Sequence, residues 1–178
     1  ELCNDASSVG ADAFLMVTPY YNKTSQAGLI AHYNYIADRV NQPIILYNVP
    51  SRTGVNIKPE TYKELSKHQN IVATKEASGD LSLVAQIKYL CGDDLDVYSG
   101  NDHQTIPMLS LGGIGVISVL SNIVPKVMHD ICELYFKGDI KSARDLQIKY
   151  TGLMNAMFCD VNPIPVKEAM NILGLDVG

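Results

Sequence analysis

Five apolar runs follow one another along this chain, and each is followed by a segment with helical periodicity. The runs begin near residues 13, 44, 71, 95 and 114. Strands that alternate with helices pair in parallel, and a strand that is apolar throughout is typical of a sheet covered on both faces. The sequence therefore predicts an α/β fold built on a parallel sheet.

Two parallel architectures accommodate this alternation. A doubly wound sheet usually carries a glycine-rich phosphate turn after its first strand, whereas the first loop here reads Pro-Tyr-Tyr-Asn over residues 19–22. We therefore favour a (β/α)8 TIM barrel. Such a barrel has eight units in about 250 residues, and only about five units are recognisable here. We expect residues 1–137 to form strands 4 to 8 of a partial TIM barrel, with the first three βα units absent.

Helical periodicity and capping residues support a division between a partial barrel and a C-terminal helical region. Residues 1–9 have the pattern of the second half of an amphipathic helix that ends at Gly10, and Ser25 is a candidate N-cap for the next helix. After the last predicted strand the pattern is helical only, over residues 139–158 and 165–173. We expect residues 138–178 to be the start of a C-terminal helical region whose extreme C-terminus is absent.

Charge and cysteine content exclude several functional classes. The formal net charge is -5 and no basic cluster is present, which argues against nucleic acid as a partner. No apolar run approaches the ~20 residues of a membrane span. The cysteines and histidines are dispersed without metal-ligand spacing, so we expect no metal site, no disulfide framework and a cytoplasmic location. These residues are Cys3, Cys91, Cys132, Cys159, His32, His68, His103 and His129.

Lys75 lies near the end of the third predicted strand, where both faces of the strand are apolar. Burial of an ammonium group is costly, and proteins usually respond by lowering its pKa. A shift from about 10.4 to about 7 requires roughly 4 to 5 kcal/mol, and the resulting neutral amine is a nucleophile. One hypothesis is a lysine that forms a Schiff base with a carbonyl substrate. The alternative is a strand-end lysine that extends its amine to water.

Two further side chains fall at the same predicted edge. Tyr47 ends the second strand and could exchange protons beside the amine, although a core tyrosine with a satisfied hydroxyl is the alternative. Arg52 follows on a Pro-Ser-Arg-Thr-Gly turn and could bind a carboxylate, or simply be a solvated loop arginine. Glu76 points to the opposite face from Lys75, so we interpret it as a structural group.

Several motifs together resemble the dihydrodipicolinate synthase (4-hydroxy-tetrahydrodipicolinate synthase) family of pyruvate-dependent class I aldolases, and the likeness extends along the whole chain. The resemblance implies a (β/α)8 barrel with a C-terminal helical region, usually a cytoplasmic homotetramer. It also implies a lyase that condenses pyruvate with L-aspartate 4-semialdehyde in lysine (diaminopimelate) biosynthesis. The motifs are Val-Thr-Pro-Tyr-Tyr-Asn (17–22), Leu-Tyr-Asn-Val-Pro-Ser-Arg-Thr-Gly (46–54), Thr-Lys-Glu-Ala-Ser-Gly (74–79), Ser-Gly (99–100), Gly-Val-Ile-Ser (115–118) and Asn-Pro-Ile-Pro-Val-Lys (162–167).

By this resemblance, Lys75 forms the imine with pyruvate, and no separate cofactor or metal is required. Tyr47 becomes the proton donor and acceptor, and Arg52 binds a substrate carboxylate at the mouth of the site. The backbone around Ile117, with Gly100, is implied to line the pyruvate pocket.

The resemblance also assigns the two adjacent tyrosines. Tyr21 is implied to belong to a proton relay, and in the family this tyrosine reaches across a subunit interface into the neighbouring site. Tyr20 matches an interface tyrosine that contacts the inhibitor lysine in feedback-regulated members.

One part of the family pattern does not occur here. The Gly-Thr-Thr-Gly-Glu loop, which supplies a relay threonine and contacts to pyruvate, is absent from the sequence, so we expect the 178 residues alone to be inactive. The alternatives are a sibling aldolase that acts on another 2-keto acid and a non-catalytic truncated chain. The arginine in the Tyr-Asn-Val-Pro-Ser-Arg-Thr-Gly segment favours the synthase over its sibling enzymes.

Overall fold

A computed structural model of the protein describes residues 1–178, which divide into two compact units. The first unit spans residues 1–98 and the second spans residues 99–178. None of the helices is both long and apolar enough to cross a membrane.

The first unit is built on a parallel sheet whose strands follow one another in sequence order. Tyr47 is the register partner of Lys75, and the register shifts by one residue where Ile44 pairs with Ile71 but Ile45 pairs with Ala73. The strands are β1 (Phe14–Val17), β2 (Ile44–Asn48), β3 (Ile71–Glu76) and β4 (Asp96–Ser99), the last of which ends at the first residue of the second unit.

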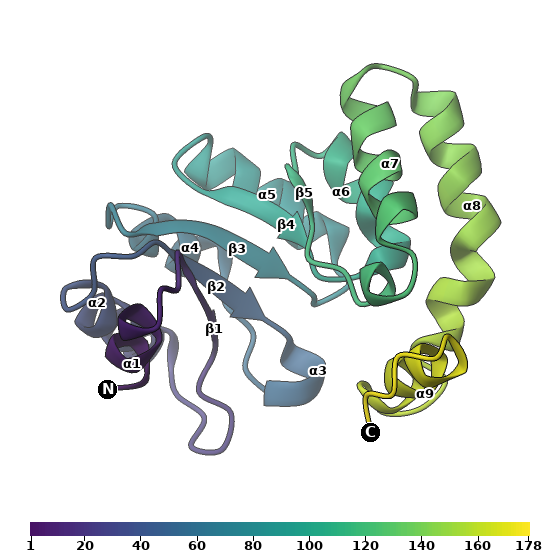
Figure 1. Ribbon diagram of the computed structural model, residues 1–178. Helices are drawn as coiled ribbons and strands as arrows, with labels where there is room; N and C mark the ends of the chain where they lie inside the picture. Colours follow the sequence, from purple (N-terminus) through teal and green to yellow (C-terminus); the bar gives the residue numbers. More distant parts are fainter. The chain divides into compact units, whose positions relative to one another are not determined.

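Helices of the first unit begin and end where the sequence places capping residues. The Ser25 hydroxyl accepts a hydrogen bond from the backbone of Gly28, the carboxylate of Asp80 caps the fifth helix, and Gly10 adopts a φ of 91° after the first. Helix α4 packs against both α2 and α5 (Figure 1). The helices are α1 (Leu2–Ser8), α2 (Gln26–Ala37), α3 (Pro50–Thr53), α4 (Pro59–Leu65) and α5 (Leu81–Cys91).

The two faces of this sheet have different environments. We define the rear face as the side chains of Ile44, Leu46, Asn48, Thr74 and Glu76, all of which are buried. The opposite side chains alternate with them along the strands. This inner face comprises Leu15, Val17, Ile45, Tyr47 and Lys75, of which Leu15 is 46% and Val17 is 36% exposed.

The second unit is mainly helical. Helices α7 and α8 run antiparallel, side by side (Figure 1), and enclose a core of Leu120, Met128, Ile131, Met154, Met157 and Val166. The elements are η1 (Asp102–Gln104), α6 (Thr105–Ser110), β5 (Gly115–Val116), η2 (Leu120–Asn122), α7 (Pro125–Phe136), α8 (Ile140–Ala156) and α9 (Ile164–Ile172).

The predicted parallel α/β fold is confirmed, with two local differences. The fifth strand has only two residues, and side chains take backbone donors shortly after it. The Asp102 carboxylate accepts hydrogen bonds from the backbone of Val119 and Leu120, at 3.2 and 2.9 Å. The predicted turn at residues 50–54 contains the single helical turn α3. The predicted boundary between residues 137 and 138 stays a prediction.

Candidate active site

Lys75 and Tyr47 meet on the inner face of the first unit. The two residues are register partners on neighbouring parallel strands, so their side chains project to the same side of the sheet. The Lys75 Nζ atom lies 4.4 Å from the centroid of the Tyr47 ring. This distance allows a cation–π attraction when the amine is charged, and it keeps the phenol beside the amine when it is neutral.

Tyr47 is well suited to hold and release a proton. Burial raises the pKa of the Tyr47 hydroxyl above its ordinary value, while the Arg52 guanidinium acts in the opposite direction. The hydroxyl therefore remains protonated at neutral pH and can donate to an oxygen atom of a substrate.

A cleft of about 470 Å³ is lined by Tyr47, the register partner of Lys75. Arg52, on the exposed turn α3, contributes a cationic group to a lining that is otherwise mostly apolar, and Tyr47 contributes a hydroxyl. An apolar cleft of this size with one guanidinium and one phenol suits a small molecule that carries a carboxylate. The lining residues are Leu15, Val17, Tyr20, Tyr47, Val49, Arg52 and Thr53.

The two adjacent tyrosines are placed differently. Tyr20 is 65% exposed and lines the cleft, whereas Tyr21 is 89% exposed and is not among the lining residues. The structure thus brings Tyr20 close to Tyr47 and Arg52, and it leaves Tyr21 on the surface of the first unit. The roles predicted for both tyrosines stay predictions.

Gly100 and Ile117 belong to the second unit. Gly100 follows the last residue of β4, and the backbone N–H of Ile117 donates a hydrogen bond of 2.9 Å to the carbonyl oxygen of Ser99. Both residues therefore lie at the carboxyl ends of their strands, as predicted. Their roles in a pyruvate pocket stay predictions.

Asn48 is a residue whose importance the sequence analysis did not recognise. It directly follows Tyr47 and is fully buried on the rear face. Its Nδ2 atom donates to both carboxylate oxygens of Glu76, at 3.2 and 2.9 Å, and to Oδ1 of Asn56 at 2.7 Å. The signal that could have revealed it is a polar side chain in register with Glu76 on strands predicted to be covered.

Glu76 is a structural group of the rear face, in agreement with the interpretation from sequence. It is 3% exposed, and its carboxylate also accepts hydrogen bonds from the Tyr62 hydroxyl at 3.0 Å and the Ser78 backbone at 2.7 Å. Burial raises the pKa of Glu76, while the hydrogen bonds from Ser78, Asn48 and Tyr62 oppose that rise.

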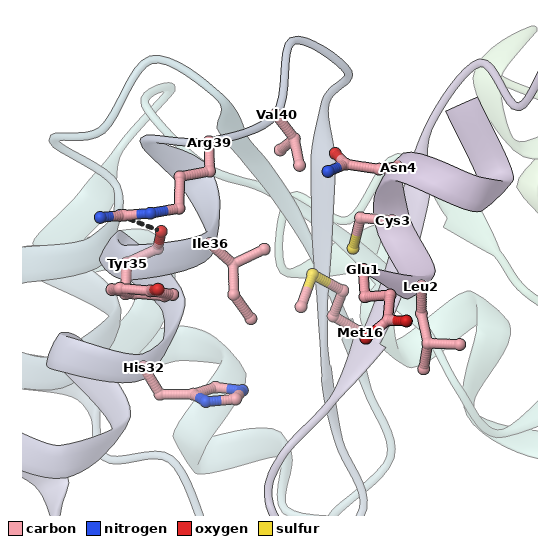
Figure 2. A pocket seen from close by; sticks show the side chains of 10 residues that line it. All are labelled: Glu1, Leu2, Cys3, Asn4, Met16, His32, Tyr35, Ile36, Arg39 and Val40. Carbon is pink, nitrogen blue, oxygen red and sulfur yellow. Dashed lines mark hydrogen bonds between the residues drawn. The ribbon is translucent and has the colours of Figure 1, made fainter. Parts of the chain in front are cut away.

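A larger cavity, of about 600 Å³, contains none of the predicted site residues. Figure 2 shows Met16 of β1 and Cys3 of α1 on one side, with His32 and Ile36 of α2 on the other. Burial lowers the pKa of His32. Because the smaller cleft is lined by Tyr47 and Arg52 and this cavity contains neither, we assign the chemistry to the smaller cleft.

One group of side chains could in principle hold a metal ion. Ligand atoms of His129, Asp130 and Glu133 lie within 4.8 Å of one another on α7. The two carboxylates are already paired, Asp130 with Lys126 and Glu133 with Lys137, each at 2.6 Å. An exposed cluster neutralised in this way gives no support for a metal centre.

The chain matches the dihydrodipicolinate synthetase family over residues 1–178. It is 57% identical over 178 residues to the 4-hydroxy-tetrahydrodipicolinate synthase of Clostridium perfringens, covering 100% of this chain and 61% of that protein. It is 59% identical over 177 residues to the synthase of Caldicellulosiruptor saccharolyticus, covering 99% and 60%.

Solved structures give the same result. The dihydrodipicolinate synthase of Thermotoga maritima superposes with a TM-score of 0.95 at 44% identity, covering 98% of this chain and 60% of that one. The 4-hydroxy-tetrahydrodipicolinate synthase of Methylacidiphilum fumariolicum gives a TM-score of 0.97 at 40% identity, covering 99% and 60%. The predicted partial TIM barrel is thereby confirmed, and the chain spans about 60% of the length of these relatives.

Proposed function

We propose, because the chain belongs to the dihydrodipicolinate synthetase family, that the full-length protein condenses pyruvate with L-aspartate 4-semialdehyde through an imine on Lys75. This is the reaction of lysine (diaminopimelate) biosynthesis, and we propose a cytoplasmic location for it. The observation that carries the proposal is the placement of the Lys75 amine beside the Tyr47 phenol, next to a cleft that contains Arg52.

The first chemical step follows from this geometry. The neutral amine of Lys75 attacks the keto carbon of pyruvate, and the carbonyl oxygen takes up a proton. In this proposal Tyr47 supplies that proton and then assists the loss of water, which leaves the imine; the 4.4 Å between the Lys75 Nζ atom and the Tyr47 ring centroid supports this role. No metal ion or organic cofactor is needed, because the imine itself withdraws electrons from the adjacent carbon.

The second step starts from the imine on Lys75. Loss of a proton from the pyruvate methyl group gives an enamine, which attacks the aldehyde carbon of the second substrate and forms the carbon–carbon bond. Attack of the substrate amine on the imine carbon then releases Lys75. The guanidinium of Arg52 at the cleft would hold a substrate carboxylate in a bidentate pair.

We include a homo-oligomer, with the tetramer as the expected form, in the same proposal. Tyr20 and Tyr21 are large aromatic side chains that are 65% and 89% exposed at the carboxyl end of β1. Exposed aromatic residues beside a reactive cleft favour contact with a second subunit.

Trapping with borohydride tests the proposal. The full-length protein is incubated with pyruvate and reduced, and a stable adduct is expected on the peptide that contains Lys75, with none in a Lys75→Arg variant. Turnover is then measured with L-aspartate 4-semialdehyde. An adduct without this turnover would indicate a sibling aldolase, and the absence of any adduct would disprove imine chemistry.

A further inference from the structure

Asn48 connects three segments that carry the predicted reacting groups. Its own strand presents Tyr47, the preceding residue, on the inner face. Its amide nitrogen holds the carboxylate of Glu76, the residue after Lys75, at 2.9 and 3.2 Å. Its backbone oxygen also accepts a hydrogen bond of 2.9 Å from Ala77. The ends of β2 and β3 are therefore tied together by side-chain and backbone contacts.

The same side chain closes the loop that carries Arg52. Asn48 Nδ2 donates to Asn56 Oδ1 at 2.7 Å, and Asn48 Oδ1 accepts from the backbone of Ile57 at 3.1 Å. The chain leaves the sheet at Asn48, passes through α3 and returns to the same side chain eight residues later. The turn that bears Arg52 is thus anchored at both ends by one amide.

The contacts of Asn48 with Glu76 and Ile57 are sheltered from water. Asn48 is fully buried and Glu76 is 3% exposed. The amide nitrogen uses both of its donors and the amide oxygen accepts one bond. A buried amide with satisfied hydrogen bonds holds its neighbours in one arrangement, because breaking any contact leaves a polar group unpaired.

We propose that Asn48, through its hydrogen bonds to Glu76, is a positioning residue for the reacting groups on the inner face of the sheet. The inference rests on the proposed function for the identity of the reaction. The geometric part concerns the Lys75–Tyr47 pair alone and does not require any particular substrate. Asn48 touches no substrate in this scheme and acts only through the residues that flank it and its partner.

The central test is Asn48→Asp in the full-length protein. The change keeps the shape of the side chain, removes both N–H donors and places a second carboxylate against Glu76. Because a misplacement of about 1 Å can cost about 100-fold in rate, we expect a loss of about 100-fold in kcat. Asn48→Ser removes the same donors without adding charge, and it serves as the second variant if the aspartate protein does not fold.

A second substitution that restores kcat distinguishes a positioning role of Asn48 from a role in stability alone. Adding Glu76→Gln to Asn48→Asp exchanges the amide and the carboxylate between the two strands and restores a donor–acceptor pair. We expect the double variant to regain at least about tenfold of the lost kcat. The matched control is Thr74→Val, which removes hydrogen bonds to Leu46 and Tyr62 on the same face and leaves the Asn48–Glu76 pair intact. The control is expected to lower the melting temperature without this loss of kcat.

A spectroscopic readout makes the test independent of pyruvate. Reductive methylation with ¹³C-formaldehyde labels Lys75, and its resonance is assigned by its absence in Lys75→Arg. The Tyr47 ring, whose centroid lies 4.4 Å from Nζ, displaces that resonance by its ring current. We expect the displacement to shrink in Asn48→Asp, to return in the double variant and to persist in Thr74→Val.

The outcomes separate the two proposals. A resonance that responds to Asn48 in a protein that forms no pyruvate adduct supports the positioning role and overturns the proposed substrate. An unchanged resonance and an unchanged kcat in Asn48→Asp overturn the positioning role, whatever the substrate. A folded double variant that performs no better than the single one overturns the pairing with Glu76.

Discussion

The two faces of one sheet carry separate tasks in the first unit. On the rear face, Leu46, Asn48 and Glu76 are buried, and the amide of Asn48 donates a hydrogen bond to the carboxylate of Glu76. On the inner face, Tyr47 and Lys75 are only partly buried, and Tyr47 lines a cleft. Successive residues of the same strand therefore serve different purposes, because side chains alternate between the two faces.

Stability and reactivity can therefore depend on residues that are direct neighbours in one strand. Outside the Asn48–Glu76 pair, which we propose positions the reacting groups, substitutions on the rear face should change the free energy of unfolding, while those on the inner face should change the rate. Substitutions in the full-length protein test this distinction between effects on stability and effects on rate.

The largest effect is expected from Lys75→Arg. The guanidinium stays protonated and cannot attack a carbonyl, so kcat should fall by about 10⁴-fold or more. The melting temperature should stay close to that of the unaltered protein. Steady-state kinetics and a thermal melt check both parts, and retention of substantial turnover would remove Lys75 from the mechanism.

Tyr47→Phe should reduce kcat by about 10²- to 10⁴-fold, because the proton donor and acceptor is lost while the ring remains. Imine trapping should become slower but should still occur. In the unaltered protein, the raised pKa of Tyr47 should keep the hydroxyl protonated beyond its ordinary titration near pH 10. Rates of adduct formation measured as a function of pH check this, and a variant as fast as the unaltered protein would contradict the assigned role.

On the rear face, Leu46→Ala should lower the free energy of unfolding by about 2 to 5 kcal/mol, since Leu46 is fully buried and its truncation leaves a cavity. The turnover of each folded molecule should change little. Urea unfolding and active-site titration with pyruvate and borohydride give the two numbers. A variant that is stable but slow would blur the distinction between the faces.

Arg52→Lys should keep the charge and lose the planar fork. The loss of one hydrogen bond to a charged group corresponds to about 10- to 100-fold in kcat/KM. We expect the loss to be expressed for the substrate whose carboxylate Arg52 binds, with imine formation less affected. Separate KM values for the two substrates identify it, and equal changes for both would argue against one specific contact.

The smallest effect concerns the pH dependence of stability. The folded pKa of Glu76 is raised above the unfolded value of about 4.3, so the folded state binds the proton more tightly. The contribution of Glu76 to stability is therefore greatest below about pH 4.3 and decreases as the pH rises through the folded pKa. Urea unfolding at several pH values should show this slope, and Glu76→Gln should remove it. A slope of the opposite sign would mean that the hydrogen bonds outweigh burial.

Much of this organisation could be predicted from the sequence. Apolar runs located the strands, and Ser25 and Gly10 each located one helix end. Lys75 and Tyr47 were recognised as a pair because both end strands of a predicted parallel sheet.

Other features depend on contacts between residues distant in the sequence. Beyond the short strand β5, the carboxylate of Asp102 accepts hydrogen bonds from backbone donors 17 and 18 residues away. The role of Asn48 depends on Glu76, 28 residues later, and on where the loop through α3 returns. Local patterns carry no information about such partners, since hydrophobic periodicity indicates which face a side chain occupies and does not identify the distant residue that it contacts.

The register shift in β3 decides on which side of the sheet the chemistry takes place. Ile71 pairs with Ile44, yet Ala73 pairs with Ile45, so Val72 is one extra residue in the strand. If the register of Ile71 with Ile44 continued without this shift, Lys75 would pair with Asn48 and join the packed rear face, and Glu76 would turn to the inner face. An amine would then occupy a site built for a carboxylate. The one-residue shift in pairing at Val72 thus selects which of two neighbouring side chains lies on the inner face, and any transfer of this strand to another scaffold must preserve the pairing of Lys75 with Tyr47.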